Sequence, residues 1–256
     1  MPHTIALAGK GGVGKTTITG MLIEYLIDKK KTPILAVDAD ANSNLNEVLG
    51  VEVDMTLGDI REEIERSESS KDNPIPAGVT KADYAEQKFN QALVEDDDFD
   101  LLVMGRTQGK GCYCFVNGLL STQVQKYSSQ YKYIVVDNEA GMEHLSRGVL
   151  PSVDTVILVS DASRRGIQAC ARIHELVKEL KQGEKQMKLI VNRAKAGEIS
   201  EGVKEEIEQS GMELLCVLPV DEDVYEYDGE GKPTSGLPKD NPMKKALYAA
   251  LDTLKF

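Results

Sequence analysis

A nine-residue stretch near the start of the chain, residues 9–17, constrains the fold more than any other part of the sequence. It reads GKGGVGKTT and matches the pattern G-x-x-x-x-G-K-[ST]. An apolar run, Ile5–Ala8, precedes it and a helical pattern follows, which is the strand–loop–helix order of a phosphate-binding loop. Glycines let successive backbone N–H groups point at one anion, and the N-terminal end of the helix adds positive potential. The alternative is a glycine-rich turn that binds no nucleotide. The predicted nucleotide-binding residues of the loop are Gly11, Gly12, Val13, Gly14, Lys15, Thr16 and Thr17.

Three side chains of this loop have predicted chemical roles. Lys15 is expected to reach the β- and γ-phosphates of ATP or ADP, and the Thr16 hydroxyl is expected to ligate Mg²⁺. Lys10 is placed differently, because the loop wraps away from it. We expect Lys10 to reach across a dimer interface into the partner's nucleotide, in the manner of an arginine finger. The alternative for Lys10 is a solvated lysine in a variable loop position.

The loop sequence also resembles a known family. The run GKGGVGKTT is similar to the deviant phosphate-binding loop of the MinD and ParA ATPases, the nitrogenase iron protein and the metallocentre-assembly ATPases. This resemblance implies an ATP-hydrolysing enzyme that forms a nucleotide-dependent homodimer, with Lys10 and Lys15 as catalytic cations.

Length and charge limit the remaining possibilities. The chain has 256 residues, and we predict one α/β domain over residues 1–256. A formal net charge of −12 argues against nonspecific nucleic-acid binding, which requires lysine and arginine to displace counterions. The sequence has neither an apolar run long enough to span a membrane nor a signal-peptide pattern at its start, so we expect a cytoplasmic protein without a membrane partner.

Short apolar runs alternate with helical patterns along the whole chain. The runs are continuously apolar, which is typical of strands covered on both faces. This pattern predicts a doubly wound, mostly parallel sheet of about seven or eight strands with helices on both faces. The polar stretch Glu95–Asp98 is expected to be a solvated corner, and Tyr225–Asn241 a long surface loop. The last helical pattern, Met243–Phe256, is expected to dock on the sheet. The predicted strands are Thr4–Leu7, Pro33–Val37, Leu101–Met104, Tyr133–Val136, Thr155–Val159, Lys188–Val191 and Glu213–Val217.

Aspartates stand at the ends of two predicted strands. Asp137 ends an apolar run and is expected to hold Mg²⁺, directly or through a water molecule. The family resemblance implies that Asp40 orients the attacking water in catalysis. It also implies that Asp38 supports the loop or the water shell of the magnesium ion. The alternative for Asp38 and Asp40 is that they only cap the turn after the strand.

Polar residues at the ends of two later strands match positions where the resembled family contacts adenine. They are Asn192 with Arg193, and the backbone after Pro219. The alternative is that these are ordinary polar residues at strand ends.

Four cysteines divide into two groups. Cys170 and Cys216 lie in apolar patterns and are expected to be buried, like small hydrophobic residues. Cys112 and Cys114 are two residues apart, so they are poor disulfide partners, but they project to one side of an extended backbone. Two thiolates do not complete the coordination of Zn²⁺, Cu⁺ or Ni²⁺, whereas a two-fold dimer supplies four. The alternative is a partly buried cysteine pair without a metal.

A second resemblance is more specific. The segments around Met104–Arg106, Gly111–Cys114 and Asp137–Gly148 are similar to the CooC/AcsF-type accessory ATPases. Those proteins serve carbon monoxide dehydrogenase and acetyl-CoA synthase by nickel insertion. The resemblance implies nickel at Cys112 and Cys114 across a homodimer, with either enzyme as acceptor, and zinc also suits the same thiolates. Glu143 and His144 are expected to relay the nucleotide state or add a ligand, or His144 is only a polar residue at a helix start.

Two other functions fit the same superfamily. A MinD- or ParA-like positioning switch needs a membrane-targeting helix, and Met243–Phe256 is only mildly amphipathic. The other is an iron–sulfur electron donor or carrier, although the resembled nitrogenase iron protein and Mrp-type carriers use cysteine spacings that this sequence lacks. We therefore expect an ATP-dependent nickel metallochaperone.

Overall fold

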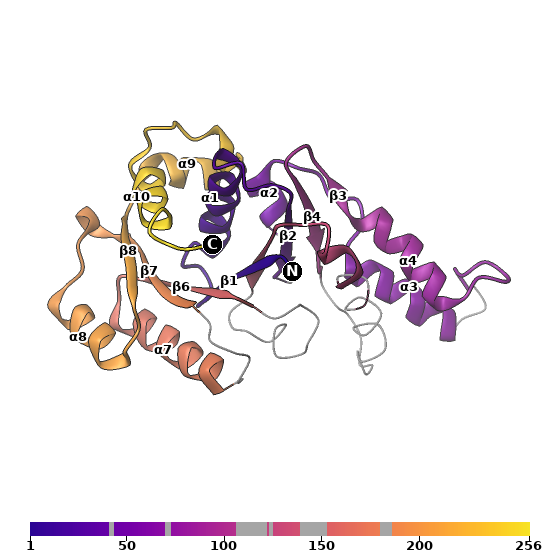
Figure 1. Ribbon diagram of the computed structural model, residues 1–256, viewed down its shortest axis with the longest axis horizontal. Coiled ribbons are helices and arrows are strands. Elements are labelled where there is room, and N and C mark those ends of the chain that lie inside the picture. The colour runs from indigo at the N-terminus through magenta and orange to yellow at the C-terminus, as the bar shows by residue number, and fades with distance from the viewer. Residues whose placement is uncertain (41–43, 70–72, 106–121, 123–124, 139–152, 180–185) are drawn as a thin grey trace.

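An eight-stranded sheet with helices on both faces forms the framework of the protein (Figure 1). The computed structural model describes residues 1–40, 44–69, 73–105, 122, 125–138, 153–179 and 186–256. The strands are β1 His3–Gly9, β2 Ile34–Ala39, β3 Val94–Glu95, β4 Phe99–Val103, β5 Tyr133–Asn138, β6 Thr155–Asp161, β7 Gln186–Ala194 and β8 Leu214–Pro219. The α-helices are α1 Lys15–Asp28, α2 Leu45–Leu49, α3 Leu57–Ser69, α4 Lys81–Ala92, α7 Arg164–Glu179, α8 Glu201–Ser210, α9 Glu222–Gly229 and α10 Pro242–Leu251. None of these described helices is long and apolar enough to cross a membrane.

The strand order confirms the predicted fold class. It is β3-β4-β2-β5-β1-β6-β7-β8, and every pair is parallel except β3 with β4. The chain leaves β1 toward β2 on one side, and the strands from β6 onward lie on the other side. Strand β1 is therefore at the point where the winding reverses, and ligands of such sheets bind beyond the carboxyl ends of the strands there.

Side chains of β1 alternate between two separate hydrophobic cores. Ile5 and Leu7 belong to the core under α1, α2 and α10. Ala6 and Ala8 belong to the opposite core, under α3, α4, α7 and α8. Figure 1 shows α1 and α10 on one face of the sheet and α7 and α8 on the other. This alternation has the period of two that a strand imposes, and burial on both faces explains why the run is continuously apolar.

The structure adds detail to one prediction about local structure and corrects another. Glu95–Asp98 is an exposed corner before β4, as expected. It is also the turn of a hairpin at the sheet edge, because Val94–Glu95 form the short strand β3 and the Asp96 N–H donates to the Phe99 carbonyl. Tyr225–Asn241 is not one long loop, because it contains most of α9 and a 3₁₀ turn at Thr234–Gly236.

Cys170 is fully buried as predicted, whereas Cys216 is only partly buried on β8. Helix α10 packs on β8 and α1 with Met243, Leu247 and Leu251 buried, in agreement with the predicted docking helix.

Candidate functional site

The loop between β1 and α1 has the backbone geometry of an anion cradle. Gly12 and Gly14 have φ values of 77° and 88°, which lie in the left-handed region that glycine adopts readily. A Cβ atom at Gly14 would lie 2.5 Å from the Asn192 Nδ2 atom, so a larger residue cannot stand there without displacing that side chain. Helix α1 begins at Lys15 with no side-chain cap and no acidic residue in its first turn. Its first N–H groups and its positive end are therefore available to an anion.

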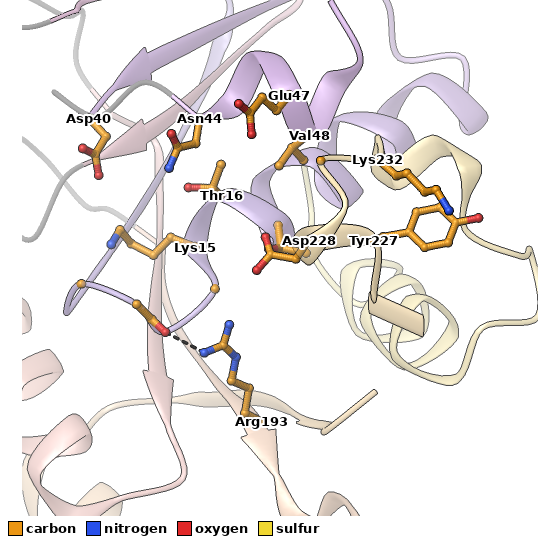
Figure 2. A pocket seen from close by; sticks show the side chains of 15 residues that line it. Lys15, Thr16, Asp40, Asn44, Glu47, Val48, Arg193, Tyr227, Asp228 and Lys232 are labelled. Atoms are coloured by element: carbon orange, nitrogen blue, oxygen red, sulfur yellow. Dashed lines mark hydrogen bonds between the residues drawn. The ribbon is translucent and has the colours of Figure 1, made fainter. Parts of the chain in front are cut away.

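Lys15 is held at the mouth of this cradle. Its side chain is buried, and Nζ donates to the Lys10 carbonyl oxygen across the loop at 3.2 Å. Figure 2 shows the ammonium group of Lys15 and the hydroxyl of Thr16 on the same side of the loop, in the direction of Asp40. Lys10 itself is exposed. This placement suits Lys15 for the phosphates bound by its own chain, and it leaves the Lys10 side chain in solvent.

Two buried carboxylates lie side by side at the ends of neighbouring strands. Asp38 of β2 and Asp137 of β5 are register partners, and both are at most 1% exposed. Burial raises the pKa of Asp38 to about 6 and that of Asp137 to about 7. For Asp137, hydrogen bonds of the Thr16 and Thr19 side chains and the charge of Lys15 lower the pKa, but desolvation outweighs them.

Asp38 organises the turn that follows β2. Its Oδ1 atom accepts from the Asp40 N–H and its Oδ2 atom from the Leu45 N–H, each at 3.0 Å. These two bonds hold Asp40, the first residue after β2, and Leu45, the first residue of α2. Asp40 and Asn44 both line the cavity beside the phosphate-binding loop (Figure 2). The turn-capping role is thus observed for Asp38. The predicted roles of Asp38 near magnesium and of Asp40 in orienting water stay predictions.

The side chains around Asp137 fit a magnesium ion. Its Oδ1 atom is buried and has no hydrogen-bond partner among the described residues. An unpartnered carboxylate oxygen in a dry site is costly unless a cation balances it. The oxygen atoms nearby belong to the Thr16 hydroxyl and the Asp38 carboxylate. Mg²⁺ prefers oxygen ligands of this kind. Thr16 and Asp137 would therefore hold the ion, which would neutralise phosphate charge.

Replacing Asp137 by asparagine is expected to stabilise the nucleotide-free protein at neutral pH and above. The raised pKa means that the folded state binds the proton more tightly than the unfolded state. Stability from this group is therefore complete below about pH 4 and is lost as the pH rises through about 7. At about 1.4 kcal/mol per pKa unit, the variant should gain on the order of 4 kcal/mol over wild type at about pH 8 but only about 1 to 2 kcal/mol at about pH 5. Urea unfolding in EDTA measures both differences, and an equal difference at the two pH values would contradict the prediction. Adding Mg²⁺·ADP should stabilise wild type far more than the variant.

Asn192 and Arg193 hold the phosphate-binding loop from the other side. The Asn192 Nδ2 atom donates to the Val13 carbonyl at 2.9 Å. The Arg193 Nη1 atom donates to the Gly12 carbonyl at 2.8 Å (Figure 2). Arg193 has a φ of 55°, which is uncommon for a residue with a side chain, and it lies where the β7–β8 register is irregular. The strand end is thus shaped to aim both side chains at the loop. The predicted contact of the Asn192 amide with adenine stays a prediction.

Two cavities meet at the start of α1. The first has a volume of about 390 Å³ and extends from the phosphate-binding loop to α2 and α9. The second has a volume of about 190 Å³, and its wall includes the apolar side chains of Pro219, Val220, Val224 and Met243. Four residues line both cavities: Gly14, Thr17, Arg193 and Asp228. A polar cradle beside an apolar pocket has the layout that a nucleotide needs. The predicted Pro219 contact lies in the apolar pocket, which supports it as a base site.

Sequence reasoning missed several residues of this site. Asn138 follows Asp137, and its Nδ2 atom donates to the Leu7 carbonyl at 2.8 Å, which ties β5 to β1 just before the loop. The α9 side chains in the first cavity were assigned to a surface loop, although Asp221 at the start of α9 is a recognisable N-cap. The predicted residues Cys112, Cys114, Glu143 and His144 lie outside the described residues.

Comparison with known proteins agrees with this geometry. Residues 4–234 match the family described as the CobQ/CobB/MinD/ParA nucleotide binding domain. The chain belongs to this family. It is an ATPase of the MinD/ParA superfamily, which supports the predicted role of the phosphate-binding loop.

Relatives of this MinD/ParA-type chain match it over almost its full length. An uncharacterized ATP-binding protein of Methanocaldococcus jannaschii is 44% identical over 95% of this chain and 94% of its own. The carbon monoxide dehydrogenase accessory protein CooC of Rhodospirillum rubrum is 31% identical over 96% of this chain and 95% of its own. The solved structure of the septum site-determining protein MinD with Mg-ADP from Pyrococcus horikoshii shares the fold. It has a TM-score of 0.69 and 21% identity, with 99% of this chain and 96% of that chain covered.

Proposed function

We propose that this protein is an ATP-hydrolysing metallochaperone that delivers nickel to carbon monoxide dehydrogenase, acetyl-CoA synthase or both. The observation that carries the proposal is a Cys112-x-Cys114 pair in a chain that resembles CooC over almost its whole length. Nickel is the cargo in this scheme, whereas ATP and Mg²⁺ drive the cycle. Two chains bring four thiolates to the two-fold axis, which is enough for a soft divalent ion.

The described residues support the nucleotide half of this scheme. Lys15 and the N–H groups of the loop would bind the phosphates, Thr16 and Asp137 would hold Mg²⁺, and Asp40 would orient the attacking water. Phosphoryl transfer needs little beyond an in-line water molecule, a metal ion and cations on the phosphates. Lys10 of the partner chain would supply the last cation.

The end of β4 offers a physical connection between the two halves. The Met104 N–H donates to the Asp38 carbonyl at 2.8 Å, and the Met104 carbonyl accepts from the Gly58 N–H at 2.9 Å. The segment that carries Cys112 and Cys114 follows soon after Met104 in the sequence. In the proposed cycle, a change at Asp38 on ATP binding is passed through this backbone to the cysteines, so that hydrolysis alters the thiolate geometry and releases the nickel.

The principal alternative is a MinD-like positioning switch. That function needs an apolar helix face that is free to enter a membrane. In α10 the apolar residues Met243, Leu247 and Leu251 are buried against the rest of the protein, so this helix offers no such face. ATP-dependent flotation with anionic vesicles would favour the alternative over nickel delivery.

Replacing Cys112 and Cys114 together by serine is expected to abolish nickel binding. Wild type should hold about one Ni²⁺ per two chains, since each chain offers two thiolates, and the double variant close to none. Metal analysis after gel filtration measures the ratio, with and without ATP, and the elution volume reports the dimer. Zn²⁺ added in competition tests the choice of metal.

Two further measurements make this test specific. Cys216→Ser is the matched control, because Cys216 is partly buried on β8, away from the two mutated cysteines in sequence; it should leave the nickel content unchanged. The affinity of the double variant for Mg²⁺·ADP should equal that of wild type. Unchanged nickel in the double variant would refute the proposed cargo site, and failure of the nickel-loaded protein with ATP to activate nickel-free acceptor enzymes would refute delivery.

A further inference from the structure

Asp228 occupies a distinctive position between the two cavities. It is in the last turn of α9, and it is one of four residues that line both the phosphate cavity and the apolar cavity. Figure 2 shows its carboxylate pointing from α9 into the first cavity, on the side of Thr16, whereas Tyr227 and Lys232 point away from the loop.

The order of groups in a nucleotide assigns a ligand group to this position. The phosphates belong at the cradle of Gly11–Thr16, and the base fits the apolar pocket beyond Pro219. The sugar must therefore lie where the two cavities join. Gly14 offers no side chain there, and the guanidinium of Arg193 offers only donors and already binds the Gly12 carbonyl.

Asp228 is the acceptor that the sugar position requires. A carboxylate only accepts hydrogen bonds, and its two oxygens match the spacing of neighbouring ribose hydroxyls, as in dinucleotide-binding folds. Thr17 also lines both cavities, but it is the third residue of α1 and is only 9% exposed. Of the residues that line both cavities, Asp228 alone is exposed and purely an acceptor.

Local folding does not account for a carboxylate at Asp228. An acidic side chain in the last turn of a helix lies at the negative end of the helix dipole and is mildly destabilising. Lys232, the nearby cation, pairs with Glu230. Within the described part of the chain, no hydrogen bond or ion pair engages the Asp228 carboxylate. An unfavourable helix position with an unused acceptor is typical of a residue kept for a ligand.

The helix that carries Asp228 is firmly held. At its start, the Asp221 Oδ1 atom accepts from the Val224 N–H at 3.0 Å and from the Asn241 Nδ2 atom at 2.9 Å. Near its end, the Tyr227 hydroxyl donates to the Gly236 carbonyl at 2.8 Å. The position of the carboxylate relative to the phosphate-binding loop is therefore set before any ligand arrives.

We propose that Asp228 is a specificity-determining residue that accepts hydrogen bonds from the 2′- and 3′-hydroxyls of the bound ribonucleotide. This inference rests on the proposed binding of ATP and ADP by the same site. It makes the protein selective for ribonucleotides over their deoxy counterparts.

Calorimetric titration with Mg²⁺·ADP and with Mg²⁺·2′,3′-dideoxy-ADP tests the proposal. Wild type should bind ADP at least about tenfold more tightly than the dideoxy compound, because hydrogen bonds to a charged acceptor are among the stronger ones. Asp228→Ala should weaken ADP binding to the level of the dideoxy compound and leave the dideoxy affinity unchanged, so that the ratio falls to about one. Glu226→Ala is the matched control, since Glu226 is an exposed carboxylate of α9 that lines neither cavity; it should keep the wild-type ratio.

The outcomes separate this proposal from the one on which it rests. If wild type binds neither compound, both proposals are wrong. If wild type binds ADP and the dideoxy compound equally, or if Asp228→Ala keeps the wild-type ratio, the ribose-binding role of Asp228 is refuted while nucleotide binding stands.

Discussion

Replacing Lys15 by methionine is expected to lower kcat for ATP hydrolysis about 1000-fold and to weaken nucleotide binding as well. Lys15 begins α1, and its ammonium group lies beside the anion cradle, where it donates to the Lys10 carbonyl at 3.2 Å. A cation on the transferred phosphoryl group stabilises charge that grows in the transition state, and loss of one such donor typically costs a factor of 100 to 1000, roughly. Phosphate release by the purified protein at saturating ATP measures the effect.

The design of this variant separates catalysis from folding. Methionine keeps the aliphatic part of the buried side chain and removes the charge, so the melting temperature without nucleotide should not fall. Lys245→Ala, which removes an exposed lysine on α10, is the control and should hydrolyse ATP like wild type. A Lys15→Met protein with near-normal hydrolysis would show that the loop does not bind the phosphates as described.

Replacing Lys10 by alanine is expected to reduce kcat by a similar factor, about 1000-fold, but to leave ADP affinity within about twofold of wild type. The backbone carbonyl of Lys10 accepts a hydrogen bond from the Lys15 side chain, whereas Lys10 itself is exposed. A residue that acts only after the partner chain closes contributes to the transition state and not to binding by one chain. Turnover at saturating ATP and calorimetry with ADP measure the two effects separately.

Mixing two inactive variants distinguishes action across the interface from action within one chain. A dimer of Lys10→Ala with Asp40→Asn contains one site with an intact Asp40 and the partner's Lys10. Random pairing should therefore restore about a quarter of wild-type activity in an equal mixture. If Lys10 acts within its own chain, both sites of the mixed dimer are defective and the mixture stays inactive.

The sequence was sufficient to predict the fold where hydrophobic burial decides local structure. The continuous apolar runs at Thr4–Leu7 and Tyr133–Val136 became central strands covered on both faces. The phosphate-binding loop follows the first of these strands, and Asp137 lies near the end of the second. Predicting the strands therefore also predicted where the main parts of the site lie. Burial raises the pKa of Asp137, and the neighbouring Asp38 raises it further. Their pairing depends on which strands are neighbours, and no local pattern contains that information.

The prediction was wrong where long-range contacts override local composition. Residues of α9 include several acids and Gly229, a composition typical of loops. The helix forms because Asp221 caps it, Asn241 from the following segment holds that cap, and Val224 and Tyr227 pack on the core. Asp228 was missed for the same reason, since its importance comes from the cavity that α9 closes.

The alternation of β1 side chains between two cores has a consequence for how this chain can diverge. Ile5 and Leu7 belong to the core beneath α1, whereas Ala6 and Ala8 belong to the core beneath α3, α4 and α7, and the two cores have no residue in common. Substitutions that share no partners act almost independently on stability. A lineage can therefore remodel the α3–α4 side, and with it the surface offered to other molecules, while the ATP-binding side is inherited unchanged.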